Sequence, residues 1–256
     1  MPTSPRKLLS WTLLGILCLA MEPAAPSLIP PPGRMNALPS RTLWVWARPE
    51  DMRSVNPRTT ALAILDATIL VGRSVTVIPR RQPVFYPAGI RRIAVIRIEA
   101  PSAIAPGVAS RVASVILTSA EPRAAALQVD FDARVSQHAF YARLLRDLRR
   151  RMPPSLPLSI TALASWCSYD DWISRLPVDE AVPMLFRMEP DRRYAPQDMP
   201  QFRIREPLCM GSIGISTREP HPLSLAGKRV YIFPDRGWHD DLPLLSSVDP
   251  VRKVRP

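Results

Sequence analysis

Lysine is scarce in this basic chain. Only three of its 34 basic residues are lysines, although the formal net charge is +12. The arginines are scattered, and they do not alternate with aromatic residues as they do in proteins that bind single-stranded nucleic acid. We therefore expect no nucleic-acid partner.

Several catalytic motifs are absent as well. The chain has neither a G-x-S-x-G elbow nor a P-loop. Its three histidines, His138, His221 and His239, are isolated and have no cysteine or acid at ligand spacing. These absences argue against a zinc or non-haem iron site, and we expect neither a metal nor another cofactor.

Cysteines are few: Cys18, Cys167 and Cys209. Cys18 lies in the apolar N-terminal run described next. Cys167 follows the C-terminal end of one predicted strand, whereas Cys209 precedes the N-terminal end of another. These are opposite ends of a parallel barrel, so we expect no disulfide between them.

The N-terminus has the layout of a secretory signal peptide. Arg6 and Lys7 precede an apolar run over residues 8–21, which is shorter than the roughly 20 residues of a membrane span. We predict a signal peptide or an uncleaved membrane anchor at 1–21, and hence an exported, periplasmic or extracellular protein. Residues 22–40 are proline-rich and predict a linker.

After residue 40, strand-like and helical patterns alternate. The eight predicted strands are 43–47, 68–78, 92–99, 127–133, 158–165, 180–188, 212–217 and 229–233. The predicted helices are 49–65, 105–119, 136–151 and 170–176. This α/β alternation predicts a parallel sheet, and eight strands predict a closed, TIM-type (β/α)8 barrel over residues 41–240, with a C-terminal tail at 241–256. A distorted barrel or a doubly wound sheet is the alternative.

The segment 126–134 carries the strongest functional signal. Apolar and polar residues alternate along it, which puts Asp130 and Asp132 on one face near the C-terminal end of the strand, followed by Arg134. Polar groups on a core-like strand are costly unless they are paired or used. Because barrels of this kind carry their functional residues at the C-terminal ends of the strands, the segment predicts a site there.

Other strands bring polar and aromatic side chains to the same end. Arg97 and Glu99 would lie beside Asp130 and Asp132 if their strands are neighbours, since adjacent strands are about 4.8 Å apart. Three further residues stand at predicted strand ends: Trp46, Trp166 and Arg187. Carboxylates, arginines and tryptophans together suit a polar, ring-shaped ligand such as a carbohydrate.

This composition permits glycoside hydrolysis, which needs two carboxylates. Asp132 is the predicted central acid, with Asp130 and Glu99 as partner acids. The predicted ligand-binding residues are Trp46, Arg97, Arg134, Trp166 and Arg187. Two alternatives stay open: a non-catalytic, envelope-associated binding module, and a structural cluster in which the pairs Arg97–Asp130 and Glu99–Arg134 close the barrel.

Several stretches resemble a known bacterial family, the domain of unknown function 3142 (DUF3142). They are residues 127–134, 140–149, 157–167 and 178–188. The resemblance covers roughly residues 40–240. It implies a glycosidase-like barrel in an extracytoplasmic setting, and it implies no established activity.

The strand also has a looser likeness to the D-x-x-D-x-D-x-E strand of chitinase-type barrels. Asp130 and Asp132 match its second and third acids, Leu127 replaces the first, and Arg134 stands at the position of the catalytic glutamate. Arginine cannot act as a general acid near neutral pH. The chitinase mechanism is therefore not carried over, and the sequence leaves open whether the chain is an enzyme.

Overall fold

The computed structural model describes residues 33–101, 104, 107–187, 203–220 and 223–246. The predicted leader, most of the predicted linker and the end of the predicted tail lie outside these residues. Within the described ranges, no helix has the length and hydrophobicity of a membrane span.

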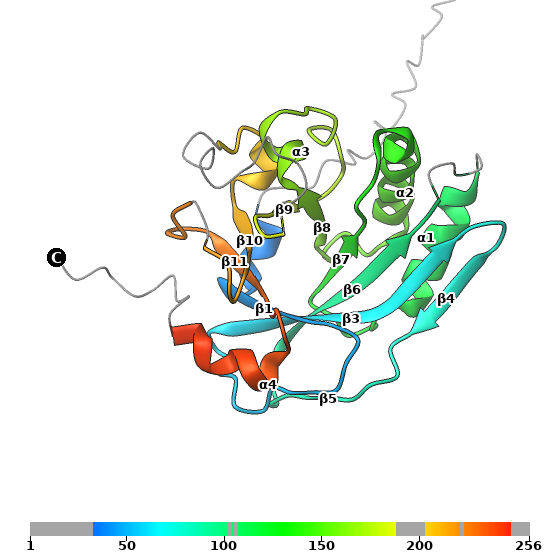
Figure 1. Cartoon of the computed structure of the whole chain (residues 1–256). Helices are drawn as coiled ribbons and strands as arrows, with labels where there is room; N and C mark the ends of the chain where they lie inside the picture. Colours follow the sequence, from blue (N-terminus) through cyan, green and yellow to red (C-terminus); the bar gives the residue numbers. More distant parts are fainter. Residues whose placement is uncertain (1–32, 102–103, 105–106, 188–202, 221–222, 247–256) are drawn as a thin grey trace, which may run out of the picture.

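Eight parallel strands close into a barrel, as the sequence predicts. They are β1 (Arg41–Val45), β3 (Thr60–Val71), β6 (Arg91–Glu99), β7 (Ala126–Asp130), β8 (Leu158–Leu163), β9 (Glu180–Met184), β10 (Ser212–Ser216) and β11 (Arg229–Phe233). Each strand pairs with the next in chain order, and β1 pairs with both β3 and β11 (Figure 1). This last pairing closes the ring and confirms the barrel.

The second barrel strand differs most from its prediction. β3 is a 12-residue strand that begins at Thr60, so the helix predicted over 49–65 is wrong. The run 61–65 is rich in helix formers, but all its side chains are buried because one face lines the barrel and the other packs under the outer layer. β3 then turns near Gly72 into β4 (Val75–Pro79), which pairs with it antiparallel.

Two helices cover one side of the barrel. They are α1 (Val108–Ser119) and α2 (His138–Arg151), close to their predicted ranges. Both helices bury apolar residues at spacings of three and four, which is the pattern of an amphipathic helix on a core. These buried residues are Ala109, Val112, Ala113 and Ile116 in α1, and Tyr141, Leu144, Leu145 and Leu148 in α2.

The other side of the barrel is covered by a part of the chain with less regular secondary structure. It includes the short parallel pair β2 (Glu50–Asp51) and β5 (Val84–Phe85), and α4 (Trp238–Asp241) after the last strand. The Trp238 indole donates to the carbonyl of Trp44 at 2.7 Å, which fastens α4 to β1. The predicted tail therefore begins inside the fold, since Asp241 is fully buried.

The N-terminal end of the barrel is closed by residues assigned to the linker. The 3-10 helix η1 (Arg34–Ala37) places Met35 and Leu38 against the interior cluster of the barrel. The Arg229 guanidinium donates to the carbonyls of both residues and to Glu180, at 2.6 to 3.1 Å. Residues 33–40 are thus part of the barrel domain and not a linker.

A disulfide joins Cys167 and Cys209, so the prediction of no bridge is wrong. Their Cα atoms are 5.8 Å apart, because both residues have left the barrel strands for the outer layer. The short helix α3 (Ala164–Ser168) follows β8 without a loop and packs against β9. The segment before β10 lies next to α3, and its Arg205 N–H donates to the Cys167 carbonyl at 2.8 Å.

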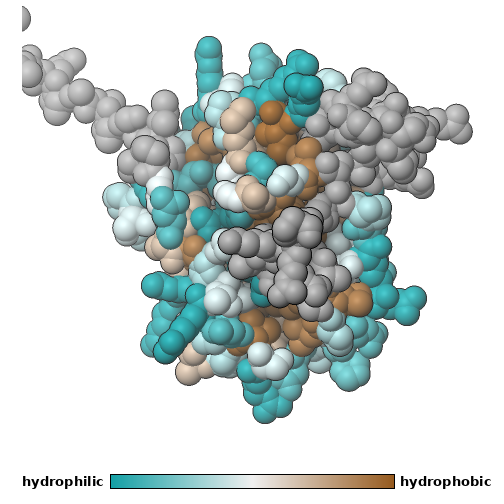
Figure 2. All heavy atoms as spheres, turned by 90° about the vertical axis from the view of Figure 1, so that its left-hand side faces the viewer, coloured by the Kyte–Doolittle hydropathy of each residue, from teal (hydrophilic) through white to brown (hydrophobic). Residues whose placement is uncertain are grey.

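Hydrophilic side chains surround the face that lies on the left of Figure 1, and hydrophobic residues show near its middle (Figure 2). Many arginines in the described residues pair with acids at separate places, such as Arg92 with Glu121 at 3.4 Å and Arg48 with Glu50 at 3.1 Å. These arginines are therefore neutralised locally by acids on neighbouring segments.

We expect the disulfide to stabilise the fold. It spans 42 residues, and closing a loop of that length lowers the entropy of the unfolded chain, which corresponds to about 3–4 kcal/mol. Urea unfolding of the wild type should shift to lower denaturant when a thiol reductant is added. The Cys167→Ala/Cys209→Ala variant should unfold at that lower midpoint and ignore the reductant. Equal wild-type midpoints with and without reductant would contradict the prediction.

Candidate functional site at the barrel mouth

The predicted charged residues meet at the C-terminal end of the barrel, here called the mouth. Arg97 on β6 and Asp130 on β7 are partners in register. An Arg97 N–H donates to Asp130 Oδ2 at 2.8 Å, and the Thr161 hydroxyl on β8 donates to Asp130 Oδ1 at 2.8 Å. Both oxygens of the buried Asp130 carboxylate therefore accept a hydrogen bond from a neighbouring strand.

The other two predicted acids lie at the rim. Glu99 ends β6 and accepts from Arg97 Nε at 3.3 Å. Asp132 lies two residues beyond β7 and is exposed. Partial burial in the mouth and the Asp130 charge raise the pKa of Asp132, while Arg97 opposes this effect. The site thus holds one carboxylate fixed by hydrogen bonds and one exposed carboxyl that takes up a proton more readily.

An aromatic wall faces this cluster across the mouth. It consists of Trp46, Phe186 and Phe233, which follow or end β1, β9 and β11. Phe233 lies 4.6 Å from Phe186 and 6.3 Å from Trp46 between ring centroids. β11 is four strands away from β7 in the ring of eight, so the wall stands opposite Asp130. Trp46 was predicted as a site residue; the two phenylalanines were missed, although they follow the same strand-end rule.

Arg187 and Arg134 also lie at this end. Arg187 follows β9 with a left-handed φ of 50°, and its guanidinium binds Asp235 at 3.0 Å. Its N–H donates to Glu219 at 2.9 Å, from the loop after β10. Arg134 is exposed four residues after β7, at the start of the turn that leads into α2. Both arginines are therefore placed at the rim.

The structure does not bring Trp166 to the mouth, and its predicted stacking role is wrong. Trp166 lies in α3, is 3% exposed, and packs edge-on against Trp172 at 4.9 Å in the outer layer. The cause is the early end of β8 at Leu163, after which α3 turns away from the mouth. His138 stacks on Trp172 at 3.8 Å in the same layer.

No group of three or more metal-ligating side chains occurs in the part of the chain that the structure describes. Among the predicted acids, Asp130 and Glu99 bind arginine or threonine instead.

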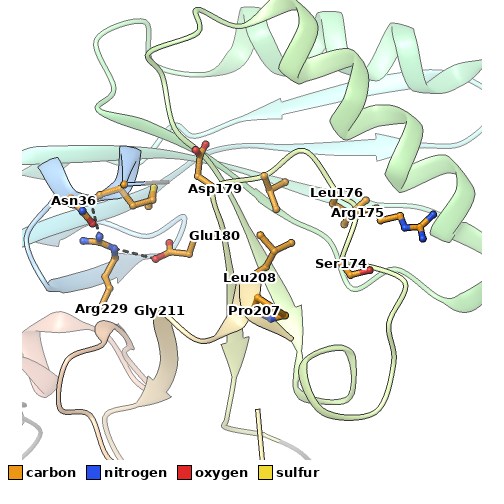
Figure 3. Close-up of a pocket in the computed structure, with 13 residues that line it drawn as sticks. Asn36, Ser174, Arg175, Leu176, Asp179, Glu180, Pro207, Leu208, Gly211 and Arg229 are labelled. Atoms are coloured by element: carbon orange, nitrogen blue, oxygen red, sulfur yellow. Dashed lines mark hydrogen bonds and ion pairs between the residues drawn. The ribbon is translucent and has the colours of Figure 1, made fainter. Parts of the chain in front are cut away.

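A cavity of about 660 Å³ lies at the opposite, N-terminal end of the barrel (Figure 3). Met35, Leu176 and Leu208 form part of its lining, and no predicted site residue does. Two of its four charged residues, Glu180 and Arg229, bind each other, and Glu180 also accepts hydrogen bonds from the hydroxyls of Ser159 and Tyr231. These polar groups satisfy one another, and the mouth, where the predicted residues gather, is the candidate site.

Residues 89–189 match the model of a family described as Domain of unknown function (DUF3142), which confirms the predicted resemblance. The matched range contains Glu99, Asp130 and Asp132 but not Trp46. A search among curated proteins gives no match.

One solved structure with a similar arrangement is the chitinase domain of the spore coat protein CotE from Clostridium difficile. The two chains are 13% identical, and the alignment covers 67% of this chain and 53% of that one, with a TM-score of 0.37. The chain thus spans about half of that domain, and the fold assignment rests on the strand pairings described above.

The Arg97–Asp130 pair should matter for stability. We expect Arg97→Met to destabilise the protein by about 2–3 kcal/mol at neutral pH, because it leaves a buried carboxylate without its cation. Arg97→Met/Asp130→Asn should recover most of this loss, and the exposed Arg134→Met should change little. Urea unfolding of the four proteins tests the pair; a double variant no more stable than Arg97→Met would contradict it.

Ionisation of the Asp132 carboxyl should lower the free energy of unfolding. The folded pKa of this carboxyl is raised above the ordinary value of an aspartate by burial and by the Asp130 charge, so the folded state binds more protons and stability falls as pH rises from the unfolded pKa through the folded one. We therefore expect Asp132→Asn to stabilise the protein near pH 7 but not near pH 3, where the carboxyl is protonated in both states. NMR titration of the Asp132 carboxyl carbon, together with unfolding at the two pH values, measures this; a gain that does not depend on pH would refute it.

Proposed function

We propose that this is an exported protein whose barrel mouth binds a glycan, on which Asp132 acts as the proton donor for glycoside hydrolysis. One observation carries the proposal. An exposed carboxyl with a raised pKa lies beside a second carboxylate, Asp130, that is held by Arg97 and Thr161. Environments that separate the behaviour of two neighbouring carboxyl groups are typical of acid–base sites.

The two carboxyl groups have different roles in this proposal. Asp132 gives its proton to the glycosidic oxygen as the bond to the sugar carbon breaks. A water molecule adds to that carbon, and the proton it releases restores the Asp132 carboxyl. Asp130 stays fixed and provides negative charge beside the cationic sugar that develops in the transition state.

The aromatic wall supports a sugar ligand. The half-buried Trp46 packs against the Phe233 ring, and this contact restricts the orientation of the indole. A fixed aromatic face can pack on the apolar face of a sugar ring while polar groups across the mouth bind its hydroxyls. Arg97, Arg134 and Arg187 are the proposed donors to these hydroxyls or to anionic substituents.

Two features support export. The N-terminal sequence has the layout of a leader, and a disulfide joins Cys167 and Cys209. Disulfides persist in oxidising compartments such as the periplasm or the cell exterior. The proposal therefore places the protein outside the cytoplasm, where polysaccharides are available.

A second candidate function is glycan binding without hydrolysis. Arg134 favours it, because this arginine occupies the position at which chitinase-type strands carry their catalytic glutamate. In this case the mouth would keep its aromatic wall and its hydroxyl donors, and Asp132 would act only as an acceptor.

Assays with a panel of soluble polysaccharides test these functions. We expect the wild type to cleave at least one of them and Asp132→Asn to lower kcat by about 10²- to 10⁴-fold, the range for a lost general acid. Trp46→Ala should weaken binding by about 3- to 10-fold through loss of one aromatic contact.

The matched control is Phe85→Ala, which removes an exposed aromatic ring on β5, a strand that pairs with β2 and is not part of the barrel. Binding without cleavage by the wild type would favour the second candidate. Cleavage that survives in Asp132→Asn would remove Asp132 from the mechanism, and absence of any binding would exclude both functions.

A further inference from the structure

A second, smaller groove adjoins the mouth on the side of the β3–β4 hairpin. It encloses about 270 Å³ and is lined by Ala47, Leu65, Ala67, Thr68 and residues 77–82. Leu65 belongs to the interior cluster of the barrel, and Ala47 directly follows Trp46 of the aromatic wall. The groove therefore begins where the aromatic wall ends.

The unequal lengths of two neighbouring strands create this groove. β1 ends at Val45, opposite Ile64, whereas β3 continues for seven more residues to Val71. β3 and β4 project beyond the ring together and lie beside α1 (Figure 1). Beyond β1, the edge of β3 pairs with β4 from Ala67 onward, so the groove lies between the end of β1 and the β3–β4 hairpin.

Arg80 fixes the outer wall of the groove. Its guanidinium donates to the carbonyls of Trp46 and Arg48, and its Nε donates to the Gln82 carbonyl at 2.8 Å. Its backbone N–H donates to the Asp66 carbonyl at 2.7 Å. These bonds hold the segment after β4 against both neighbouring strands, so the groove has a defined shape.

The groove has the chemistry of a sugar subsite. Thr68 pairs in register with Arg97, which puts its position level with the Arg97–Asp130 pair of the mouth. Arg81 and Gln82 are exposed along the wall, and Ile78 is 51% exposed. A hydroxyl, an amide and a guanidinium beside an apolar side chain can bind the hydroxyls and one face of a sugar ring.

We infer that the groove is an additional subsite, which holds the next unit of a chain-like glycan whose other units lie over the mouth. This inference rests on the proposed function and makes it more specific: the ligand is an oligosaccharide or polysaccharide and not a single sugar. The chain would run from the aromatic wall at Trp46 past Ala47 and Thr68 toward Arg81 and Gln82.

Calorimetric binding of oligosaccharides of increasing length tests the inference. The probes are β-1,4-linked glucose and N-acetylglucosamine oligomers of two to six units. We expect the wild type to bind the longest oligomer of one series about tenfold more tightly than the dimer. The Arg81→Ala/Gln82→Ala variant should lose this gain and bind the dimer as the wild type does, because about two hydrogen bonds are removed from the groove alone.

The matched control is Arg73→Ala, which removes an exposed arginine at the turn of the same hairpin. It should bind all lengths like the wild type, and thermal melts should show all variants folded. Equal affinity for all lengths, or a groove variant that weakens dimer and hexamer alike, would overturn the subsite and leave glycan binding at the mouth intact. Absence of binding to any oligomer of either series would instead count against both proposals.

Discussion

The pairing of β1 with both β3 and β11 is the constraint on which the rest of the molecule depends. It converts an open sheet into a ring without free edges, so inward side chains meet solvent only at the two ends. The N-terminal end is closed by Met35 and Leu38, which the Arg229–Glu180 pair holds in place. At the other end, the strand ends bring the polar residues of the candidate site together.

Strand register explains why neighbouring acids at the mouth behave differently. Thr68, Arg97 and Asp130 lie level on three adjacent strands, so the Asp130 carboxylate meets its cation inside the ring. Asp132 lies two residues farther along the same chain, beyond the last residue of β7. Its side chain is exposed to solvent. Two residues along the chain thus separate the hydrogen-bonded carboxylate of Asp130 from the carboxyl of Asp132, which binds a proton more readily.

The sequence was sufficient to predict contacts between residues on strands that are consecutive in the chain. Alternation along 126–134 predicted that Asp130 and Asp132 share one face near the strand end, and the neighbourhood of consecutive strands predicted the Arg97–Asp130 pair. The sequence-based predictions failed for segments that connect the strands along the outside of the barrel. The disulfide at Cys167 and the burial of Trp166 both follow from α3 turning away immediately after Leu163, and a turn of five residues leaves little periodicity to detect.

The rim also argues against a purely structural cluster. A cluster that only closed the barrel would pair its buried charges with one another, as the Arg97–Asp130 pair does. Asp132 is instead exposed with a raised pKa, so its ionised form opposes folding. Arg187 adopts a left-handed φ that costs a non-glycine residue about 1–2 kcal/mol, and Glu219 and Asp235 hold it there. Neither feature is needed for closure, which β1 already provides, and the ligand that we propose at the mouth would account for both.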